Sequence, residues 1–409
     1  MMNDYANQFS LILEACRTEP DPERIEHCLQ SIGNWNHLLN IAYMHGVLPL
    51  VYKTLKSQPA AIPSKALEYF KMRNFEIAQT NLQMSSELLR IVNVFNENGI
   101  AYIALKGPVL SQIIHGDTLQ RQYTDLDLLV AQKDIYKAAL LLQENDYLPE
   151  HSIDFLKNRT FLNIGQDLTF KNKQHGVFIE LHWQLFLNLQ VRKSQITLFS
   201  AQQMSSDILG QKIDTLEFEH LLIYLCIHGS KHFWERLEWV VDIDRLVRER
   251  QGIDWSKIAN LVNAMQVEIM FYLGLSVAHG LFQTKLPDHI MEKIAQTPRI
   301  EKLRRNITDL IFDHDITQDT EQVDKFKIKH LLTLMADKKS KNLHNYFLWL
   351  FQIKKDDILT VNLPAYLFFL YYFIRIYRLL EYRYQSIKTR KSLGLKYIYL
   401  YIKAGINGK

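Results

Sequence analysis

A short apolar run, TDLDLLV at residues 124–130, carries two carboxylates two positions apart. Side chains alternate between the two faces of a strand, so Asp125 and Asp127 share one face while Leu126 and Leu128 share the other. Burying two uncompensated carboxylates costs several kcal/mol or keeps one of them protonated. The run therefore predicts a strand whose acidic face meets a positive charge, for which a metal ion is the first candidate.

The spacing of apolar residues changes twice along the 409-residue chain. Helical spacing continues to residue 98, where Gly99 is placed to end a long helix. Short strands and helices follow, and a helical pattern then returns with an amphipathic helix over 220–249. The expected fold class is α+β, with a small mixed sheet embedded between N-terminal and C-terminal helical regions. The strand-like runs lie at 100–105, 124–130, 167–171 and 177–183, and the expected regions are 1–98, 99–214, 215–300 and 301–409.

Cysteine usage and apolar runs limit the class of protein. The three cysteines, Cys16, Cys28 and Cys226, form no CxxC pair, which argues against a disulfide scaffold or a cysteine zinc site and favours a reducing compartment. The first residues lack the pattern of a secretion signal. The apolar stretch at 363–380 is interrupted by Arg375 and falls short of the ~20 residues that a membrane span needs. We therefore expect a cytoplasmic protein, at most peripheral to a membrane.

A third acid and a glycine turn accompany the two aspartates. Glu180 stands alone in the apolar run VFIELHW, as a carboxylate from a neighbouring strand would. Upstream, LKGP at residues 105–108 predicts a turn from strand to helix, with Pro108 at the first helical position. Such a turn presents backbone N–H groups to a phosphate, and Lys106 adds a positive charge. These are the parts of two-metal phosphoryl chemistry, in which the ions lie ~3.5–4 Å apart. The alternative is a pair of strand-end acids in a half-exposed sheet.

Together these motifs resemble the nucleotidyltransferases with a DNA polymerase β-like palm, and more narrowly a bacterial branch described as uncharacterised nucleotidyltransferases. The resemblance covers about residues 100–245 and rests on an LKG turn, an arginine, a (S/T)DxDLLV strand, an ELHW strand and a pattern like HGxxHxWxRLxWxxD. The matching residues here are Leu105–Gly107, Arg121, Thr124–Val130, Glu180–Trp183 and His228–Asp242.

The resemblance implies a set of roles. Asp125, Asp127 and Glu180 would hold two Mg²⁺ ions, with Mn²⁺ as an alternative, and Gly107 would lie under the nucleotide phosphates. The wider superfamily has glycine followed by serine at the phosphate turn. Here Pro108 replaces that serine and removes both its hydroxyl and one backbone donor, and Lys106 is the residue placed to compensate.

Several polar residues outside the acidic strands are further candidates. Lys231, His232 and Arg236 could contact the triphosphate. Arg121 could pair with Asp125 or Asp127, or reach phosphate, because its guanidinium suits both. His182 is either a base or supporting group, or a hydrogen-bonded strand histidine.

Two further pairs of residues have the spacing of metal-binding motifs, but they are weaker evidence for a metal site than Asp125 and Asp127. His228 and His232 lie four apart on the expected helix, yet no HExxH glutamate accompanies them, so cleft-lining histidines are favoured over a zinc site. Asp242 and Asp244 are two apart on a helix and diverge by about 200°, so they cannot hold one ion together. Asp242 alone could still face the site.

The segment 375–409 has nine basic residues and one acidic residue, a net charge of +8, with interleaved tyrosines. This composition suits an anionic membrane surface, a nucleic acid or an acidic peptide. The alternative is a solvated terminal helix.

The function we expect is Mg²⁺-dependent transfer of a nucleoside monophosphate from an NTP, ATP by frequency, to an acceptor hydroxyl with release of pyrophosphate. A small molecule or a peptide is favoured as acceptor, because the expected palm has no basic stripe for nucleic acid. Two alternatives stay open: a degenerate palm that acts as a binding or regulatory module, and metal-dependent transfer of another phosphorylated or activated group.

Overall fold

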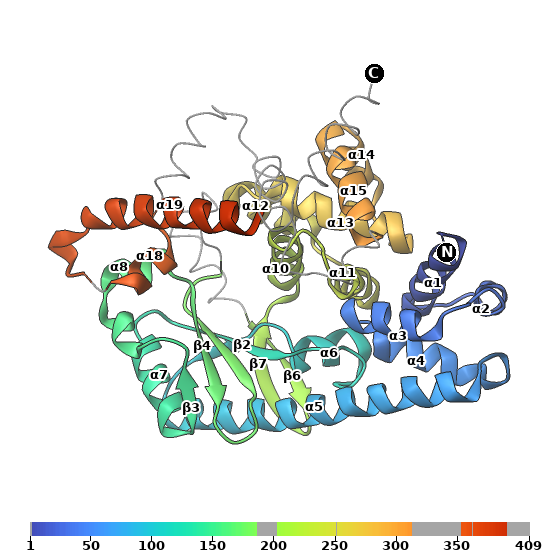
Figure 1. The fold of residues 1–409 in the computed structure, drawn as a ribbon, viewed down its shortest axis with the longest axis horizontal. Coiled ribbons are helices and arrows are strands. Elements are labelled where there is room, and N and C mark those ends of the chain that lie inside the picture. The colour runs from blue at the N-terminus through green and yellow to red at the C-terminus, as the bar shows by residue number, and fades with distance from the viewer. Residues whose placement is uncertain (1, 186–202, 251, 313–352, 362, 391–409) are drawn as a thin grey trace. The chain divides into compact units, whose positions relative to one another are not determined.

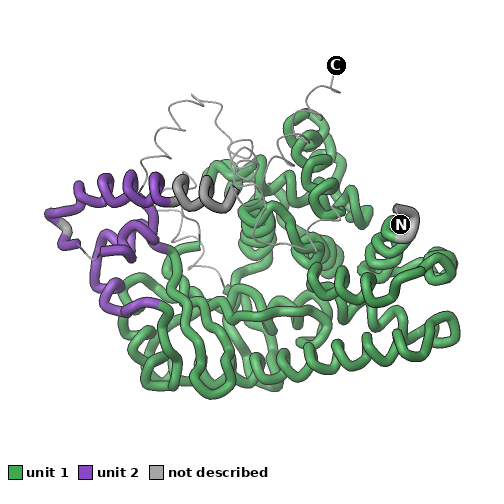
Figure 2. The backbone as a smooth tube through the Cα atoms, viewed as in Figure 1, with its two compact units in different colours: residues 1–150, 166–339 green, residues 151–165, 340–409 purple. Residues whose placement is uncertain are grey.

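The computed structural model describes residues 2–185, 203–250, 252–312, 353–361 and 363–390 (Figure 1). The chain forms two compact units, residues 1–150 with 166–339 and residues 151–165 with 340–409 (Figure 2). The first unit contains every residue that the sequence singled out for the acidic site and its surroundings.

Five helices make up the N-terminal part of the first unit, as the helical spacing predicted. They are α1 (Met2–Cys16), α2 (Pro22–Leu29), α3 (Trp35–Met44), α4 (Leu48–Ser57) and α5 (Ser64–Glu97). A 3-10 turn at Pro59–Ala61 separates α4 from α5, and Gly99 follows α5 with a φ of +68°, a left-handed conformation that suits glycine. Helix α5 runs beneath the sheet in Figure 1 and packs against β2, α6 and α7.

The central sheet has five strands in the order β1-β2-β5-β4-β3. The strands are β1 (Tyr102–Ala104), β2 (Asp125–Val130), β3 (Tyr147–Pro149), β4 (Asp167–Asn172) and β5 (Phe178–His182). Strands β2 and β5 are parallel, whereas the other three pairs are antiparallel. The connecting helices include α6 (Pro108–His115) and α7 (Ile135–Glu144). The expected mixed sheet between helical regions is confirmed.

A hairpin that the sequence pattern did not predict completes the α/β region. Its strands are β6 (Gln203–Ile208) and β7 (Gln211–Leu216), joined by Leu209 and Gly210 with φ values of +50° and +87°. Two left-handed residues match the twist of a tight hairpin turn. Strand β7 lies beside β1, and β6 lies beside α6.

The C-terminal helices of the first unit begin with α10 (Phe218–Lys231) and α11 (Leu237–Glu249). The continuous helix expected over 220–249 is therefore wrong. The helix breaks because Phe233 and Trp234 have φ values of +55° and +56°, and the Trp234 ring is fully buried against Gly229. The remaining helices are α12 (Trp255–Met265), α13 (Glu268–Phe282), α14 (Asp288–Ala295) and α15 (Pro298–Ile311).

The second unit holds the described part of the basic C-terminal segment. It contains 3-10 turns at Ile153–Lys157 and Ala365–Leu367 and the helices α8 (Arg159–Ile164), α18 (Lys355–Thr360) and α19 (Leu370–Arg390). The buried carboxylate of Asp357 binds Arg378 at 2.7 Å and lies 3.8 Å from Arg375. Among the described helices, none is long and apolar enough to cross a membrane. The end of the segment, residues 391–409, lies outside the described residues, so its expected partners stay a prediction.

Candidate functional site

The pairing of β2 with β5 brings the acidic side chains together. The parallel register places Asp127 opposite Glu180, with Asp125 two residues earlier on the same face of β2. His182 follows two residues after Glu180 on the same face of β5. One ligand atom from each of Asp127, Glu180 and His182 lies within 4.8 Å of the others. Asp127 and Glu180 therefore converge, and His182 joins them, whereas Asp125 lines the same cavity but is not part of this close group.

Two cations surround the Asp127 carboxylate, which is only 4% exposed. The Lys106 ammonium lies 3.1 Å from Oδ2, and Nε2 of His182 lies 3.0 Å from Oδ1. Although burial favours the neutral acid, Lys106 and His182 hold the pKa of Asp127 well below its usual range. Asp127 is therefore ionised and stands among donors that compensate its charge.

The pKa of Asp125 shifts in the opposite direction from that of Asp127. Burial and the nearby charge of Asp127 raise the pKa of Asp125 to about 6. Two neighbouring carboxylates resist ionising together unless a cation joins them. Oδ2 of Asp127 is in ion-pair contact with Lys106 but accepts no well-directed hydrogen bond from the described residues. A hard divalent cation, which prefers carboxylate oxygens, fits this donor set.

The turn after β1 has the conformation that the sequence predicted. Gly107 has a φ of +62°, and Pro108 is the first residue of α6. Lys106 directly precedes the glycine, and its ammonium nitrogen lies 3.5 Å from Nε2 of His228. The turn therefore connects the acidic strand β2 with helix α10 through one side chain.

Arg121 does not pair with Asp125 or Asp127, as was considered from the sequence. Its guanidinium instead donates hydrogen bonds to Asp242, from Nε at 2.9 Å and from Nη2 at 3.0 Å. The main-chain oxygen of Arg121 accepts a hydrogen bond from Asn81 at 2.8 Å. Arg121 thus fixes the loop before β2 to α11 and α5.

Asp242 and Asp244 diverge, as expected for a helix. Asp244 binds Arg248 at 2.8 Å and accepts a hydrogen bond from Thr284 at 2.6 Å. The two carboxylates therefore have separate structural partners.

A cavity of about 480 Å³ lies over the acidic strands. Eleven of the twelve residues that the sequence singled out line it, and the twelfth, Asp242, binds Arg121 in its wall. Several other lining residues have weak signals or none in the sequence. Trp239 stood in the HGxxHxWxRLxWxxD pattern without a role. The others are Gln122, Tyr123, Thr124, Gln166, Leu185, Tyr224 and Glu238.

The helices α10 and α11 supply more cations to the cavity. Lys231 donates hydrogen bonds to the side-chain oxygen of Gln166 at 3.4 Å and to the main-chain oxygen of Leu185 at 3.2 Å. Burial lowers the pKa of Lys231 to about 8. Arg236 lies 3.0 Å from Glu238. These positions would let anionic groups of a ligand approach the helical side of the cavity.

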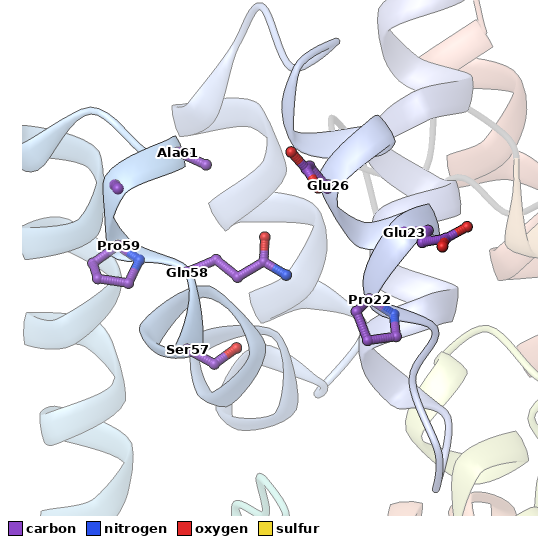
Figure 3. A pocket seen from close by; sticks show the side chains of 8 residues that line it. Pro22, Glu23, Glu26, Ser57, Gln58, Pro59 and Ala61 are labelled. Atoms are coloured by element: carbon purple, nitrogen blue, oxygen red, sulfur yellow. The ribbon is translucent and has the colours of Figure 1, made fainter.

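Another hollow lies elsewhere in the first unit, between the start of α2 and the end of α4 (Figure 3). Its volume is about 430 Å³. The side chains around it include Glu23, Glu26, Ser57 and Gln58 beside prolines and alanines. It brings together no basic, nucleophilic or metal-binding cluster, so the acid-lined cavity is the candidate site.

Comparisons with known proteins identify a family for the chain. A search of curated proteins gave no match. A solved structure of an antigenic nucleotidyltransferase-like protein from Paracoccidioides brasiliensis aligns over 57% of this chain and 91% of its own, with 12% identity and a TM-score of 0.28, which is too low to carry an argument. The family described as "Uncharacterised nucleotidyltransferase" matches residues 32–283, more than half of the chain and all of the cavity's lining. The chain belongs to this nucleotidyltransferase family.

Proposed function

We propose that the protein transfers a nucleoside monophosphate from an NTP to an acceptor hydroxyl with release of pyrophosphate. The observation that carries this proposal is the β2–β5 register, which sets Asp127 opposite Glu180 and Asp125 on the same face. The three carboxylates lie in a cavity that also contains the Lys106, Lys231 and Arg236 side chains. Acids for a metal and cations for phosphate in one cavity are the requirements of this reaction.

Asp125, Asp127 and Glu180 would hold Mg²⁺, or Mn²⁺, with the two aspartates shared between two ions and Glu180 bound to one. Bound Mg²⁺ would activate the acceptor hydroxyl and neutralise the negative charge of the triphosphate. His182 lies 3.0 Å from Asp127 and 3.4 Å from Glu180, so it positions both carboxylates. His182, His228 and Asp242 are the candidates for the general base or for a group that supports it, and which of them acts as the base stays a prediction.

The remaining polar residues would bind and orient the donor. Lys106, Lys231 and Arg236 would contact phosphate oxygens, and Gly107 would let the backbone approach them closely. Arg121, held by Asp242, would keep the loop before β2 in place and present its charge to the cavity. An acceptor would enter between the sheet and the helices α10 and α11.

Pro108 supports a second candidate, a palm that binds nucleotide without transfer. As the first residue of α6, it lacks the N–H that another residue would offer to phosphate. Lys106, two residues before Pro108, supplies a positive charge instead, which favours nucleotidyl transfer over binding alone.

Pyrophosphate release distinguishes the two candidates. The wild-type protein and the variant Glu180→Gln would be incubated with each NTP, Mg²⁺ and pools of hydroxyl-bearing metabolites and peptides. We expect metal-dependent pyrophosphate release from wild type and its loss in the variant. Metal-dependent NTP binding without pyrophosphate release from any pool would favour the binding module. Release of inorganic phosphate instead would point to transfer of another group.

A further inference from the structure

Four aromatic rings from α10, from the residue that follows it and from α11 form one wall of the acid-lined cavity. We call this set, Tyr224, His228, His232 and Trp239, the ring wall. The centroids of His228 and His232 are 4.7 Å apart, and the Trp239 centroid lies 5.4 Å and 5.3 Å from them. His232 is exposed and Trp239 is half-buried, so both rings keep surface toward solvent within the cavity.

The surroundings of the two histidines of the ring wall favour their neutral forms. The enclosing cavity and the nearby charges of Lys106 and Lys231 lower the pKa of His232, although part of its ring is exposed. Burial lowers the pKa of His228 well below its usual range. A neutral imidazole offers an aromatic surface and one N–H donor. The expected contact of His232 with the triphosphate stays a prediction.

A zinc site at these histidines lacks ligands. Within the described residues, the cluster of three or more potential metal ligands consists of Asp127, Glu180 and His182, and it includes neither His228 nor His232. The ring wall thus needs another explanation.

The ring wall begins close to the expected phosphate position. Nε2 of His228 lies 3.5 Å from the Lys106 ammonium, which lies 3.1 Å from Asp127. A phosphate chain between Lys106 and Lys231 would leave the rest of a nucleotide against the rings. Planar bases stack on aromatic side chains, and this contact tolerates any base because each one has a π face.

We propose that the nucleobase of the donor stacks on Trp239 and His232. This inference rests on the proposed function and names how the same site binds its donor. It implies that the base adds affinity beyond that of the triphosphate, and that the four NTPs all gain from the same surface.

Calorimetry with two ligands tests the stacking separately from the phosphate site. ATP and inorganic tripolyphosphate, each with Mg²⁺, would be titrated into the full-length wild type and the variants Trp239→Ala, Trp239→Phe and His232→Ala. We expect wild type to bind ATP about tenfold more tightly than tripolyphosphate. Trp239→Ala should remove most of this difference without changing tripolyphosphate affinity, Trp239→Phe should retain it, and His232→Ala should reduce it.

The outcomes separate the two proposals. Equal affinities of wild type for both ligands, or an unchanged difference in Trp239→Ala and His232→Ala, would overturn the stacking while leaving the phosphate and metal site intact. Binding of neither ligand by wild type would overturn the proposed function and the stacking with it. Because His232 is exposed, His232→Ala keeps the test decisive even if Trp239→Ala unfolds.

Discussion

Arg121 and Asp242 are 121 residues apart in the chain but form a buried, two-pronged ion pair. The side chains are only 6% and 2% exposed. The pair fixes the loop before β2, and therefore Asp125 and Asp127, against helix α11 of the cavity wall.

Removing one partner of this pair should destabilise the fold strongly. Asp242→Asn leaves the Arg121 charge buried without its carboxylate, so we expect a loss of about 3 kcal/mol in the free energy of unfolding, measured with urea. The matched control is Glu76→Gln, which breaks the exposed Arg73–Glu76 pair at 2.6 Å and should cost less than about 1 kcal/mol. Equal small losses in both variants would contradict a structural role for the buried pair.

The break between α10 and α11 depends on a glycine. A Cβ at Gly229 would overlap the ring of Trp234, which is fully buried. Gly229→Ala should therefore lower the free energy of unfolding by about 1–3 kcal/mol. The control, Gly280→Ala on α13, meets only the flexible end of Arg304 at 3.1 Å and should be neutral or stabilising by up to about 1 kcal/mol. Tolerance of Gly229→Ala, with an unchanged melting temperature, would refute this account of the break.

The pH dependence of stability should contain a contribution from Glu238. Burial raises the pKa of Glu238 to about 7, against the opposing charges of Arg121 and Arg236. The folded state then holds a proton that the unfolded state has released, so stability is lost as pH rises from about 4.5 through 7. We expect the free energy of unfolding of wild type to fall by about 3 kcal/mol more than that of Glu238→Gln between pH 4.5 and 8. Chemical denaturation at several pH values measures it, and parallel curves for wild type and variant would count against the raised pKa.

Local rules predicted the acidic strands correctly. Alternation along a strand places Asp125 and Asp127 on one face, and the same rule gives Glu180 and His182 a common face. These are consequences of a two-residue period, so they need no knowledge of the rest of the fold. The glycine and proline around residue 107 likewise specify their turn through backbone conformation alone.

Contacts between distant residues could not be predicted in the same way. The break at Phe233 and Trp234 depends on the space beside Gly229 and overrides an amphipathic pattern that suits a continuous helix. The partner of Arg121 lies on a helix far along the chain, and although Asp242 ends the HGxxHxWxRLxWxxD pattern, no local rule pairs it with Arg121. The β6–β7 hairpin is rich in polar residues and lacks the apolar alternation that marks a strand.

Metal-dependent nucleotide binding tests the central claim most directly. Calorimetric titration of the four NTPs with Mg²⁺ would compare wild type, the double variant Asp125→Asn/Asp127→Asn and the control Asp309→Asn, whose carboxylate is exposed on α15 outside the cavity. We expect wild type and the control to bind at least one NTP only when Mg²⁺ is present, and the double variant to lose that binding. Equal binding by a folded double variant, or no binding of any NTP by folded wild type, would contradict the assignment of these carboxylates to a nucleotide–metal site.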